Sequence, residues 1–207
     1  AAAIPFGATT AYDFLNNKGK LRAGERVLIN GASGSVGSVC VQMAKQMGAE
    51  VTGVCSTANI DLVLALGADH VIDYTMTDFT TLGAQYDMVI DTVGSAPWAR
   101  SQHALVPRGR MLLIAGSTSD MFLGALKARL KGKRLIGGVA SESVEVLRKV
   151  VQMATDGHFR PVIDRCFDFS QMIAAHAHVD TGHKKGNVVV TLNSQNNDQN
   201  SVEFTHV

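Results

Sequence analysis

The residues best suited to chemistry form a glycine-rich run, GASGSVG at residues 31–37, between two segments of regular pattern. The β-branched segment 26–30 precedes the run, and apolar residues at helical steps of three and four follow it. Ala32, Gly34 and Gly37 occupy the three glycine positions of the fingerprint G-x-G-x-x-G. In that fingerprint the first position makes a tight turn, the second lets the backbone approach a pyrophosphate, and the third lets the helix pack on the strand.

The chemistry that this arrangement predicts is the binding of a pyrophosphate group. A helix that begins inside the run presents free N–H groups and a partial positive charge to an anion. The strand before the run, the helix after it and a second strand that ends about 20 residues later together fit a dinucleotide-binding unit. The alternative is a turn that has only a structural role.

The end of that second strand, which we expect over residues 50–55, bears on the choice of dinucleotide. It continues as Cys55, Ser56 and Thr57. NAD sites usually have Asp or Glu here, and a carboxylate would repel the 2′-phosphate of NADP. Two hydroxyl groups in its place favour NADP, with NAD as the second possibility. Ser56 and Thr57 could instead only cap the helix that begins near Ala58.

Other phosphate and redox motifs do not match. A P-loop needs Gly-Lys followed by Ser or Thr, but Lys20 precedes Leu21 and Lys133 precedes Arg134. A short-chain dehydrogenase needs a Tyr with a Lys four residues later, which none of the three tyrosines has.

Three histidines, His176, His178 and His183, raise the question of a metal site. Residues two apart on a helix point to different faces, so His176 and His178 are not a natural chelating pair. No cysteine pair or carboxylate completes a zinc site with them. We therefore expect no metal.

Two further polar features are interpreted as structural. Asp91 closes an apolar segment before Val93 and Gly94, where it could contact a cofactor, but a turn-forming role is favoured. The basic run 127–134 could meet a phosphate or a partner, but a solvated face is favoured.

Composition excludes several classes of protein. The chain has 207 residues, of which 46% are hydrophobic and 18% charged, so it can bury a core. The net charge is +1, which predicts neither nucleic-acid nor anionic-membrane partners. No apolar run reaches the ~18–20 residues of a membrane span.

The three cysteines are widely spaced and form no C-x-x-C pair. That usage predicts a reducing compartment, and we expect a cytoplasmic protein. The start of the chain has no basic region and does not resemble a secretory signal.

Short β-rich segments alternate with helical ones, which predicts βαβ units and a parallel sheet. We expect an α/β fold, a Rossmann-type doubly wound parallel sheet with helices on both faces. The expected strands are 26–30, 50–55, 70–74, 86–91, 109–115 and 134–139, and the expected helices are 8–17, 36–47, 60–66, 97–105 and 141–155.

The later segments fall outside that alternation. Strand-like segments 162–167 and 186–192 flank a short helix, 170–179, and belong either to the same sheet or to a second domain. Residues 193–207 are polar and rich in Asn and Gln, and we interpret them as a disordered tail or an added extension. The dinucleotide-binding domain is therefore expected over residues 1–192.

The chain resembles a known family over about residues 1–192. The matching stretches, in order, are AAIP…TAY from Ala2, GASGSVG from Gly31, LGADHVIDY from Leu66, YDMVIDTVG from Tyr86 and HKKGNVV from His183. They resemble the nucleotide-binding part of the medium-chain dehydrogenases/reductases, of the zinc-independent quinone oxidoreductase (zeta-crystallin) type.

The resemblance implies positions for a bound cofactor. It places Thr10 near the nicotinamide, residues 32–36 at the pyrophosphate, and Ser56 and Tyr74 near the adenosine 2′-phosphate. It places the loops after the fourth and fifth strands at the ribose and nicotinamide, and Asn187 near the cofactor, where relatives often have Lys. With the residues at the end of the second strand, the candidate cofactor-binding residues are Thr10, Ala32, Ser33, Gly34, Ser35, Val36, Gly37, Cys55, Ser56, Thr57, Asn59, Tyr74, Thr92, Val93, Ala115, Gly116, Ser117 and Asn187.

Two departures from the family stand out. Relatives commonly have Arg or Lys just after the second strand, where this chain has Ala58 and Asn59. The missing cation weakens a 2′-phosphate site, because charge-assisted hydrogen bonds are the strong ones. Relatives also begin with a GroES-like domain, and the resemblance implies that Ala1 lies at the linker after such a domain. The strand after Asn187 would normally join that domain.

The resemblance implies an NADPH-dependent oxidoreductase that transfers a hydride to a quinone, an enone or a similar small conjugated carbonyl. No catalytic residue is assigned, and residues 1–207 alone are expected to be inactive. A homodimer through residues 135–139 is expected. The alternatives are an enoyl-reductase module of a larger multi-domain chain and a non-enzymatic dinucleotide sensor.

Overall fold

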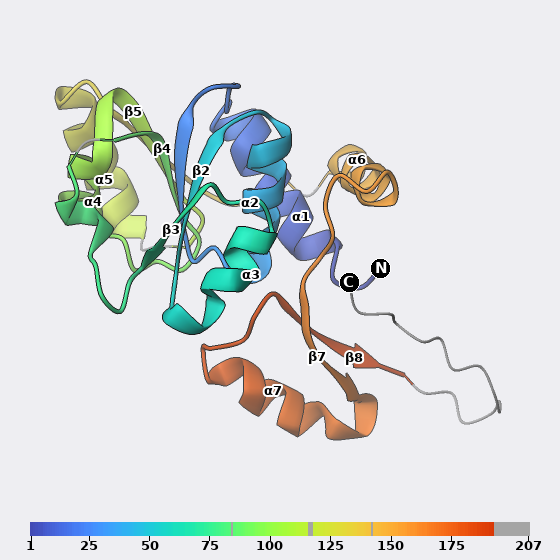
Figure 1. The fold of residues 1–207 in the computed structure, drawn as a ribbon. Coiled ribbons are helices and arrows are strands. Elements are labelled where there is room, and N and C mark those ends of the chain that lie inside the picture. Colours follow the sequence, from blue (N-terminus) through green and yellow to red (C-terminus); the bar gives the residue numbers. More distant parts are fainter. Residues whose placement is uncertain (84, 116–117, 142, 193–207) are drawn as a thin grey trace.

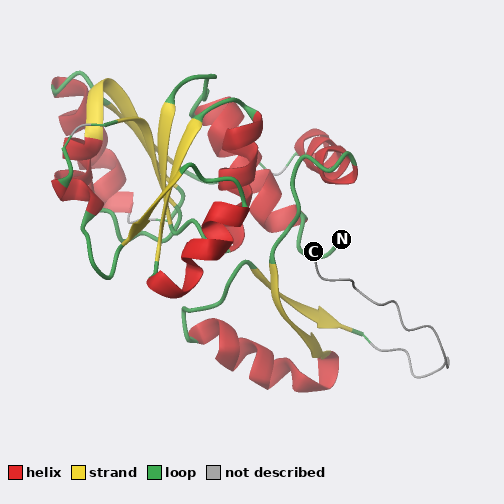
Figure 2. Cartoon of the chain, viewed as in Figure 1, coloured by secondary structure: helices red, strands yellow, loops and turns green. Residues whose placement is uncertain are grey.

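The main body of the protein is a parallel sheet of six strands with helices on both faces (Figures 1 and 2). The computed structural model describes residues 1–83, 85–115, 118–141 and 143–192, so the expected tail and the candidates Gly116 and Ser117 lie outside the described residues. The strand order is β3-β2-β1-β4-β5-β6, the order of a doubly wound dinucleotide-binding sheet, which confirms the predicted fold class. The strands are β1 (Arg26–Asn30), β2 (Glu50–Cys55), β3 (His70–Asp73), β4 (Tyr86–Asp91), β5 (Leu105–Leu113) and β6 (Arg134–Gly137).

Alternation along the strands divides the core into two layers. On β1, Val27 and Ile29 pack into one hydrophobic cluster, and Leu28 packs into the other. The first cluster lies under α1, α2 and α6, and the second lies under α4 and α5 (Figure 1). The helices are α1 (Pro5–Tyr12), α2 (Ser35–Gln46), α3 (Ile60–Ala65), α4 (Trp98–Ser101), α5 (Thr118–Leu130), α6 (Val144–Thr155) and α7 (Met172–Asp180). Within the described residues, every helix is too short or too polar to cross a bilayer.

The later segments form a small unit of their own. β7 (Ile163–Asp168) and β8 (Asn187–Thr191) pair in parallel as a separate two-stranded sheet, and α7 connects them below the main sheet in Figure 1. Of the two possibilities that the sequence left open, continuation of the main sheet is therefore wrong.

Helix α5 was not predicted, and its tertiary contacts explain why. Gly124 stands in the middle of this helix, where glycine is unfavourable by about 1 kcal/mol relative to alanine. A Cβ at Gly124 would lie 2.6 Å from Cδ2 of Leu135, so glycine lets α5 approach β6 closely. The basic run is partly engaged rather than wholly solvated, because the ammonium groups of Lys131 and Lys133 donate to the side chain and carbonyl of Gln102.

Strand β5 begins at Leu105, four residues before the expected start. Leu105 pairs with Tyr86, and Arg110 pairs with Met88, so four residues of β5 bulge between two pairs of the β4–β5 ladder. The helix expected over 97–105 therefore ends early, as α4 and a short 3₁₀ turn.

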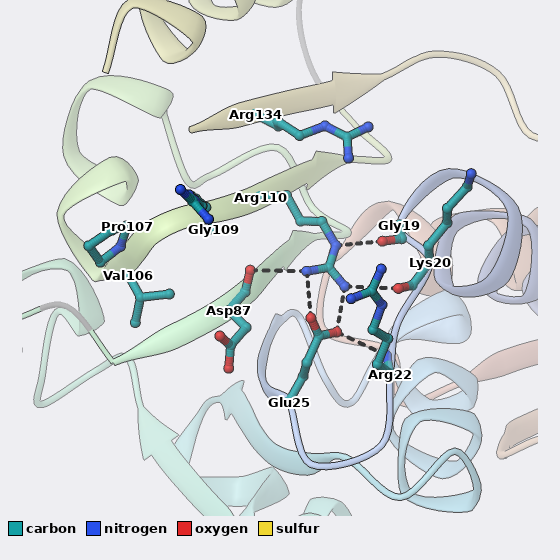
Figure 3. Close-up of a pocket in the computed structure, with 11 residues that line it drawn as sticks. Gly19, Lys20, Arg22, Glu25, Asp87, Val106, Pro107, Gly109, Arg110 and Arg134 are labelled. Carbon is teal, nitrogen blue, oxygen red and sulfur yellow. Dashed lines mark hydrogen bonds and ion pairs between the residues drawn. The ribbon is translucent and has the colours of Figure 1, made fainter. Parts of the chain in front are cut away.

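A buried ion pair fastens the edge of the sheet where the strands begin (Figure 3). Arg110, on β5, is 8% exposed, and its two terminal nitrogens donate to Glu25 Oε1 at 3.0 Å and Oε2 at 2.6 Å. The same guanidinium donates to the carbonyls of Gly19 and Lys20. Arg110 thus holds the segment between the first helix and β1 against β5.

The electrostatics of this pair has a definite sign. Burial acts to raise the pKa of Glu25, but the hydrogen bond and charge of Arg110, with the N–H and charge of Arg22, outweigh it. The pKa of Glu25 therefore lies below its usual 4.5. A carboxylate whose pKa is lowered on folding stabilises the fold above its ordinary pKa, and that stability is lost as pH falls through the lowered value.

We predict that Glu25→Gln lowers the free energy of unfolding by about 3 kcal/mol at neutral pH, because Arg110 is left buried without its counter-charge. Urea unfolding from pH 7 to pH 3 measures the effect. The difference from the unmodified chain should shrink below the ordinary pKa of glutamate, and a difference independent of pH would contradict the ion-pair explanation. Glu145→Gln, at an exposed position on α6, is the matched control.

Candidate functional site

The candidate site lies where β1 and β4 end, at the place where the strand order reverses. Asn30 is in register with Val54 of β2 on one side and with Asp91 of β4 on the other. The chain leaves β1 toward one face of the sheet and β4 toward the other, and such a reversal opens a crevice in which ligands bind.

The turn after β1 is held by two glycines whose replacement the structure does not allow. Gly31 has φ +83°, and a Cβ there would lie 2.5 Å from the hydroxyl of Thr92. A Cβ on Gly37 would lie 2.1 Å from the carbonyl oxygen of Gly31, so α2 can touch the turn only because this residue is glycine. Sequence analysis identified Gly37 and overlooked Gly31, whose requirement comes from the neighbouring β4 loop.

Gly34 differs from these two residues. Its backbone is extended, and a Cβ there would meet one protein atom, Gly31 O, at an ordinary 3.4 Å. Nothing in the described chain therefore requires glycine at this position. Gly34 is also the N-cap of α2 and supplies no side-chain hydrogen bond to the first turn, so the turn leaves room and N–H groups for an anion.

The loop after β4 is organised by one buried carboxylate. Asp91 is 1% exposed; its Oδ1 accepts from the amides of Val93 and Gly94, and its Oδ2 accepts from Ala96 N at 2.9 Å. Asn30 donates to the same carboxylate at 3.0 Å. These bonds confirm the turn-forming interpretation of Asp91 and bind the ends of β1 and β4 together.

The candidate cofactor-binding residues of the loop after β4 lie against the ends of β1 and β5. Thr92 donates its hydroxyl to the carbonyl of Asn30 at 2.8 Å. Val93 is 55% exposed at the lip of the crevice. Ala115, after β5, lies beside Gly94 of this loop.

A cavity of about 720 Å³ extends from the glycine turn past the end of β2. Seven candidates line it: Ser33, Gly34, Cys55, Ser56, Asn59, Tyr74 and Val93. Asn59 is the informative residue, because its amide nitrogen donates to Ser33 Oγ at 3.0 Å, whereas its buried Oδ1 has no hydrogen-bond partner. A buried polar atom without a partner is costly, so this oxygen favours a ligand with a donor group.

Other candidates lie beneath the surface of the site. Ala32 is fully buried, and Val36 is 8% exposed, so their side chains belong to the core and only their backbones could face a ligand. Cys55 is also buried, and burial together with the charge of Asp73 raises the pKa of its thiol to about 11. The thiol of Cys55 is thus uncharged at physiological pH and is not a nucleophile.

The end of β2 corrects one expectation. Thr57 donates its hydroxyl to Asp73 Oδ2 at 2.5 Å, so this hydroxyl is already engaged by the neighbouring β3. Ser56 is the N-cap of the short turn that follows, but its side chain makes no capping bond. The capping alternative is therefore wrong, and Ser56 lines the cavity instead.

A distant turn closes over the glycine run, and sequence analysis missed its cations. Gly186 donates its N–H to Ser33 O at 2.8 Å, and Ser35 donates to Asn187 Oδ1 at 2.6 Å. The turn carries His183, Lys184 and Lys185 into the wall of the cavity. Lys185 Nζ lies 3.5 Å from the carbonyl of Ala58, just after β2. The pattern of three basic residues before a glycine was the available signal.

Thr10 lies in a second cavity, of about 580 Å³, where α1 meets the ends of β5 and β6. It does not line the cavity of Ser33 and Asn59. The walls of this second cavity are largely apolar and include Phe6, Ile114 and Val139. The carboxyl ends of the strands therefore present two hollows, one on each side of the glycine turn.

The histidines are dispersed. His178 lies 2.6 Å from Asp164, His183 lines the larger cavity, and His176 is exposed. Among the residues that the structure describes, no three His, Cys, Asp or Glu side chains gather as potential metal ligands.

Comparison with known proteins places the chain in context. Residues 66–190 match the family described as "Zinc-binding dehydrogenase". The chain is 33% identical over 219 residues to NAD(P)H oxidoreductase RTN4IP1, mitochondrial, of Danio rerio, a match that covers 93% of this chain and 56% of that protein. It is 32% identical to quinone-oxidoreductase QR1, chloroplastic, of Triphysaria versicolor, which covers 92% of this chain and 61% of that protein.

Among solved structures, the quinone oxidoreductase from Coxiella burnetii superposes with a TM-score of 0.84. It is 30% identical in sequence, and the match covers 93% of this chain and 60% of that one. The chain thus spans somewhat more than half the length of these relatives.

The different surroundings of Gly37 and Gly34 predict different effects on stability when each is replaced by alanine. Gly37→Ala should lower the free energy of unfolding by about 3 kcal/mol, because the added Cβ collides with the backbone of the turn. Gly34→Ala should change it by less than ~1 kcal/mol, since the added methyl group would make only an ordinary contact of 3.4 Å with Gly31 O. Chemical denaturation of the two variants makes the comparison, and equal losses would contradict this account of the turn.

Proposed function

We propose that this chain binds NADPH for hydride transfer to a quinone, an enone or a similar conjugated carbonyl. The chain belongs to the zinc-binding dehydrogenase family and is of the quinone oxidoreductase type of medium-chain dehydrogenases/reductases. The observation that carries the proposal is the cradle at the start of α2. A Cβ at Gly34 would meet only Gly31 O, at an ordinary 3.4 Å, and Asn59, whose buried Oδ1 has no partner among the described residues, lines the adjoining cavity. Both features fit a dinucleotide.

The residues around the cradle would divide the cofactor among them. The amides of Ser35 and Val36 would hold the pyrophosphate at the N-terminus of α2, whereas the N–H of Gly34 donates to the carbonyl of Gly31 at 3.0 Å. Asn59, Ser56 and Tyr74 line the cavity that would take the adenosine, and Val93 lines the same cavity. We expect the loop that carries Thr92 and Val93 to border the ribose. The cavity beside Thr10 would then receive the nicotinamide.

When bound, reduced nicotinamide supplies a hydride, and the protein positions the ring and excludes water. Among the described residues that line the Thr10 cavity there is no carboxylate, imidazole or amine, and Thr9, Thr10 and Ser143 supply the side-chain hydroxyls. The proton that completes the reduction is therefore expected from water or from a segment outside residues 1–207. The proposal includes a reaction without zinc, in keeping with the dispersed histidines.

The preference for NADPH rests on Lys185. Where relatives have a cation just after β2, this chain has Ala58, and Lys185 reaches the carbonyl of that residue from a turn 127 positions away. Lys184 and Lys185 both line the cavity, whereas Arg100 is paired with Asp78. Asp73 does not line the cavity, and its carboxylate accepts from Thr57 and Thr75. The cavity thus has an excess of positive charge that suits a 2′-phosphate.

Partners and location remain part of the proposal. We infer that β6, which pairs only with β5 at the edge of the main sheet, joins two copies of the chain as a homodimer. Cytoplasmic location rests on the three free cysteines, which suit any reducing compartment, although two relatives are named mitochondrial and chloroplastic.

Fluorescence titration should show that the chain binds NADPH more tightly than NADH. Lys185→Gln should weaken NADPH binding about tenfold by removing one charge-assisted contact, and leave NADH binding unchanged. Lys127→Gln, exposed on α5, is the matched control. Equal affinity of the chain for NADPH and NADH would contradict the role of Lys185. An equal loss of affinity for both dinucleotides in Lys185→Gln would contradict it as well.

The complete product of the gene should oxidise NADPH in the presence of a quinone or an enone, followed by absorbance of the cofactor. Residues 1–207 alone should bind NADPH without turnover, because part of the wall around the nicotinamide is expected to come from outside this chain. Turnover by residues 1–207 alone would overturn that expectation.

A further inference from the structure

A third cavity, of about 300 Å³, lies at the edge of the sheet where the strands begin, opposite the glycine turn (Figure 3). The loop before β1, the bulge of β5 and the start of β6 enclose it. Its lining residues are Gly19, Lys20, Arg22, Glu25, Asp87, Val106, Pro107, Arg108, Gly109, Arg110 and Arg134. Nothing in the proposed oxidoreductase function uses this place.

Positive charge dominates the cavity. Five of its lining residues are cationic and two are acidic. Arg110 and Glu25 neutralise each other, and Asp87 accepts from the backbone N–H of Arg26 at 2.9 Å. The side chains of Lys20, Arg22, Arg108 and Arg134 make no hydrogen bond or ion pair with the described part of the chain. Arg22 acts on Glu25 only through its charge and its backbone N–H.

The backbone gives a second, independent indication. Within the described residues, Lys20 (φ 51°) and Arg108 (φ 66°) are the only residues other than glycine with positive φ. Both are cationic, both line this cavity, and 88 positions separate them. Glycine would relieve the strain at each position, yet a long cationic side chain is kept. Strained residues that persist at one place are a reason to look for a function there.

We propose that this cavity binds a small phosphate-bearing anion with three or more negative charges, for which inorganic pyrophosphate is the probe. Guanidinium groups bind phosphate oxygens in pairs, and Lys20 adds a point charge. Four cations without partners repel one another across the cavity, and a polyvalent anion relieves that repulsion. The cavity is small and open, and its four cations are exposed, so an anion can reach them directly from solvent. The distance between this cavity and the glycine turn lets both sites be filled together.

An NMR titration of the full chain with pyrophosphate, at constant ionic strength, tests the proposal. The amide signals of Gly19, Arg22 and Gly109 should shift saturably, with half-saturation at least tenfold below that of chloride or acetate. Shifts confined to residues 31–37 would place the anion at the cofactor turn and overturn the proposal. Shifts that follow ionic strength without saturation would overturn it as well.

Arg108→Gly and Lys20→Gly separate binding from folding. Each removes a cation and relieves a left-handed backbone, so each should weaken pyrophosphate binding about tenfold without lowering the melting temperature of the free chain. Arg148→Gln, exposed on α6, is the matched control and should leave the affinity unchanged. If both glycine variants bind as tightly as the unmodified chain, the proposal fails, whatever the outcome for NADPH.

Discussion

The close approach of Gly37 to the carbonyl of Gly31 is the constraint on which the carboxyl end of the sheet depends. A Cβ at Gly37 would lie 2.1 Å from that oxygen. The first turn of α2 can therefore pack on the end of β1 only because residue 37 has no Cβ. This approach points the N-terminus of α2 at the gap between β1 and β4. Asp91 completes the arrangement, because its carboxylate binds the amides of the neighbouring loop and the side chain of Asn30. The two strands therefore end at fixed positions on either side of the helix terminus.

Different interactions hold the two ends of the sheet, where the strands begin and where they end. The edge where the strands end is made of glycine, hydroxyl and amide groups around open hollows, and it leaves the buried Oδ1 of Asn59 without a partner. The end of the sheet where the strands begin is fastened by Arg110, whose guanidinium donates to Glu25 and to three backbone carbonyls, those of Gly19, Lys20 and Asp87. Arg22 contributes its charge and its backbone N–H to Glu25, whereas the side chains of Lys20, Arg108 and Arg134 take no part in that fastening. These side chains are the basis of the anion site that we propose.

The small unit of β7, α7 and β8 contributes to the site through its connections. Gln42 of α2 exchanges two hydrogen bonds with the backbone of Arg160, and Gly186 lies on the glycine turn. A Cβ at Gly186 would lie 2.3 Å from the carbonyl of Val162, so this turn can cross at such close range only as glycine. The crossing brings Lys184 and Lys185 to the wall of the large cavity, and so supplies the positive charge that the residues after β2 lack.

The sequence by itself determined the strands, the position of the glycine turn and the family, because these depend on local periodicity and on residue types at short spacing. Strands such as Arg26–Asn30 and Tyr86–Asp91 were predicted to the residue, since buried parallel strands are nearly continuous apolar runs. Only the tertiary structure decided the remainder. Helix propensity does not predict α5, because Gly124 is explained only by its close approach to Leu135. The hydroxyl of Thr57 donates to Asp73 of the adjacent strand. Lys185 meets Ala58 across 127 positions, and Lys20 lines one cavity with Arg108, 88 positions away. Contacts at such separation depend on the order of strands in the sheet, which no local pattern encodes.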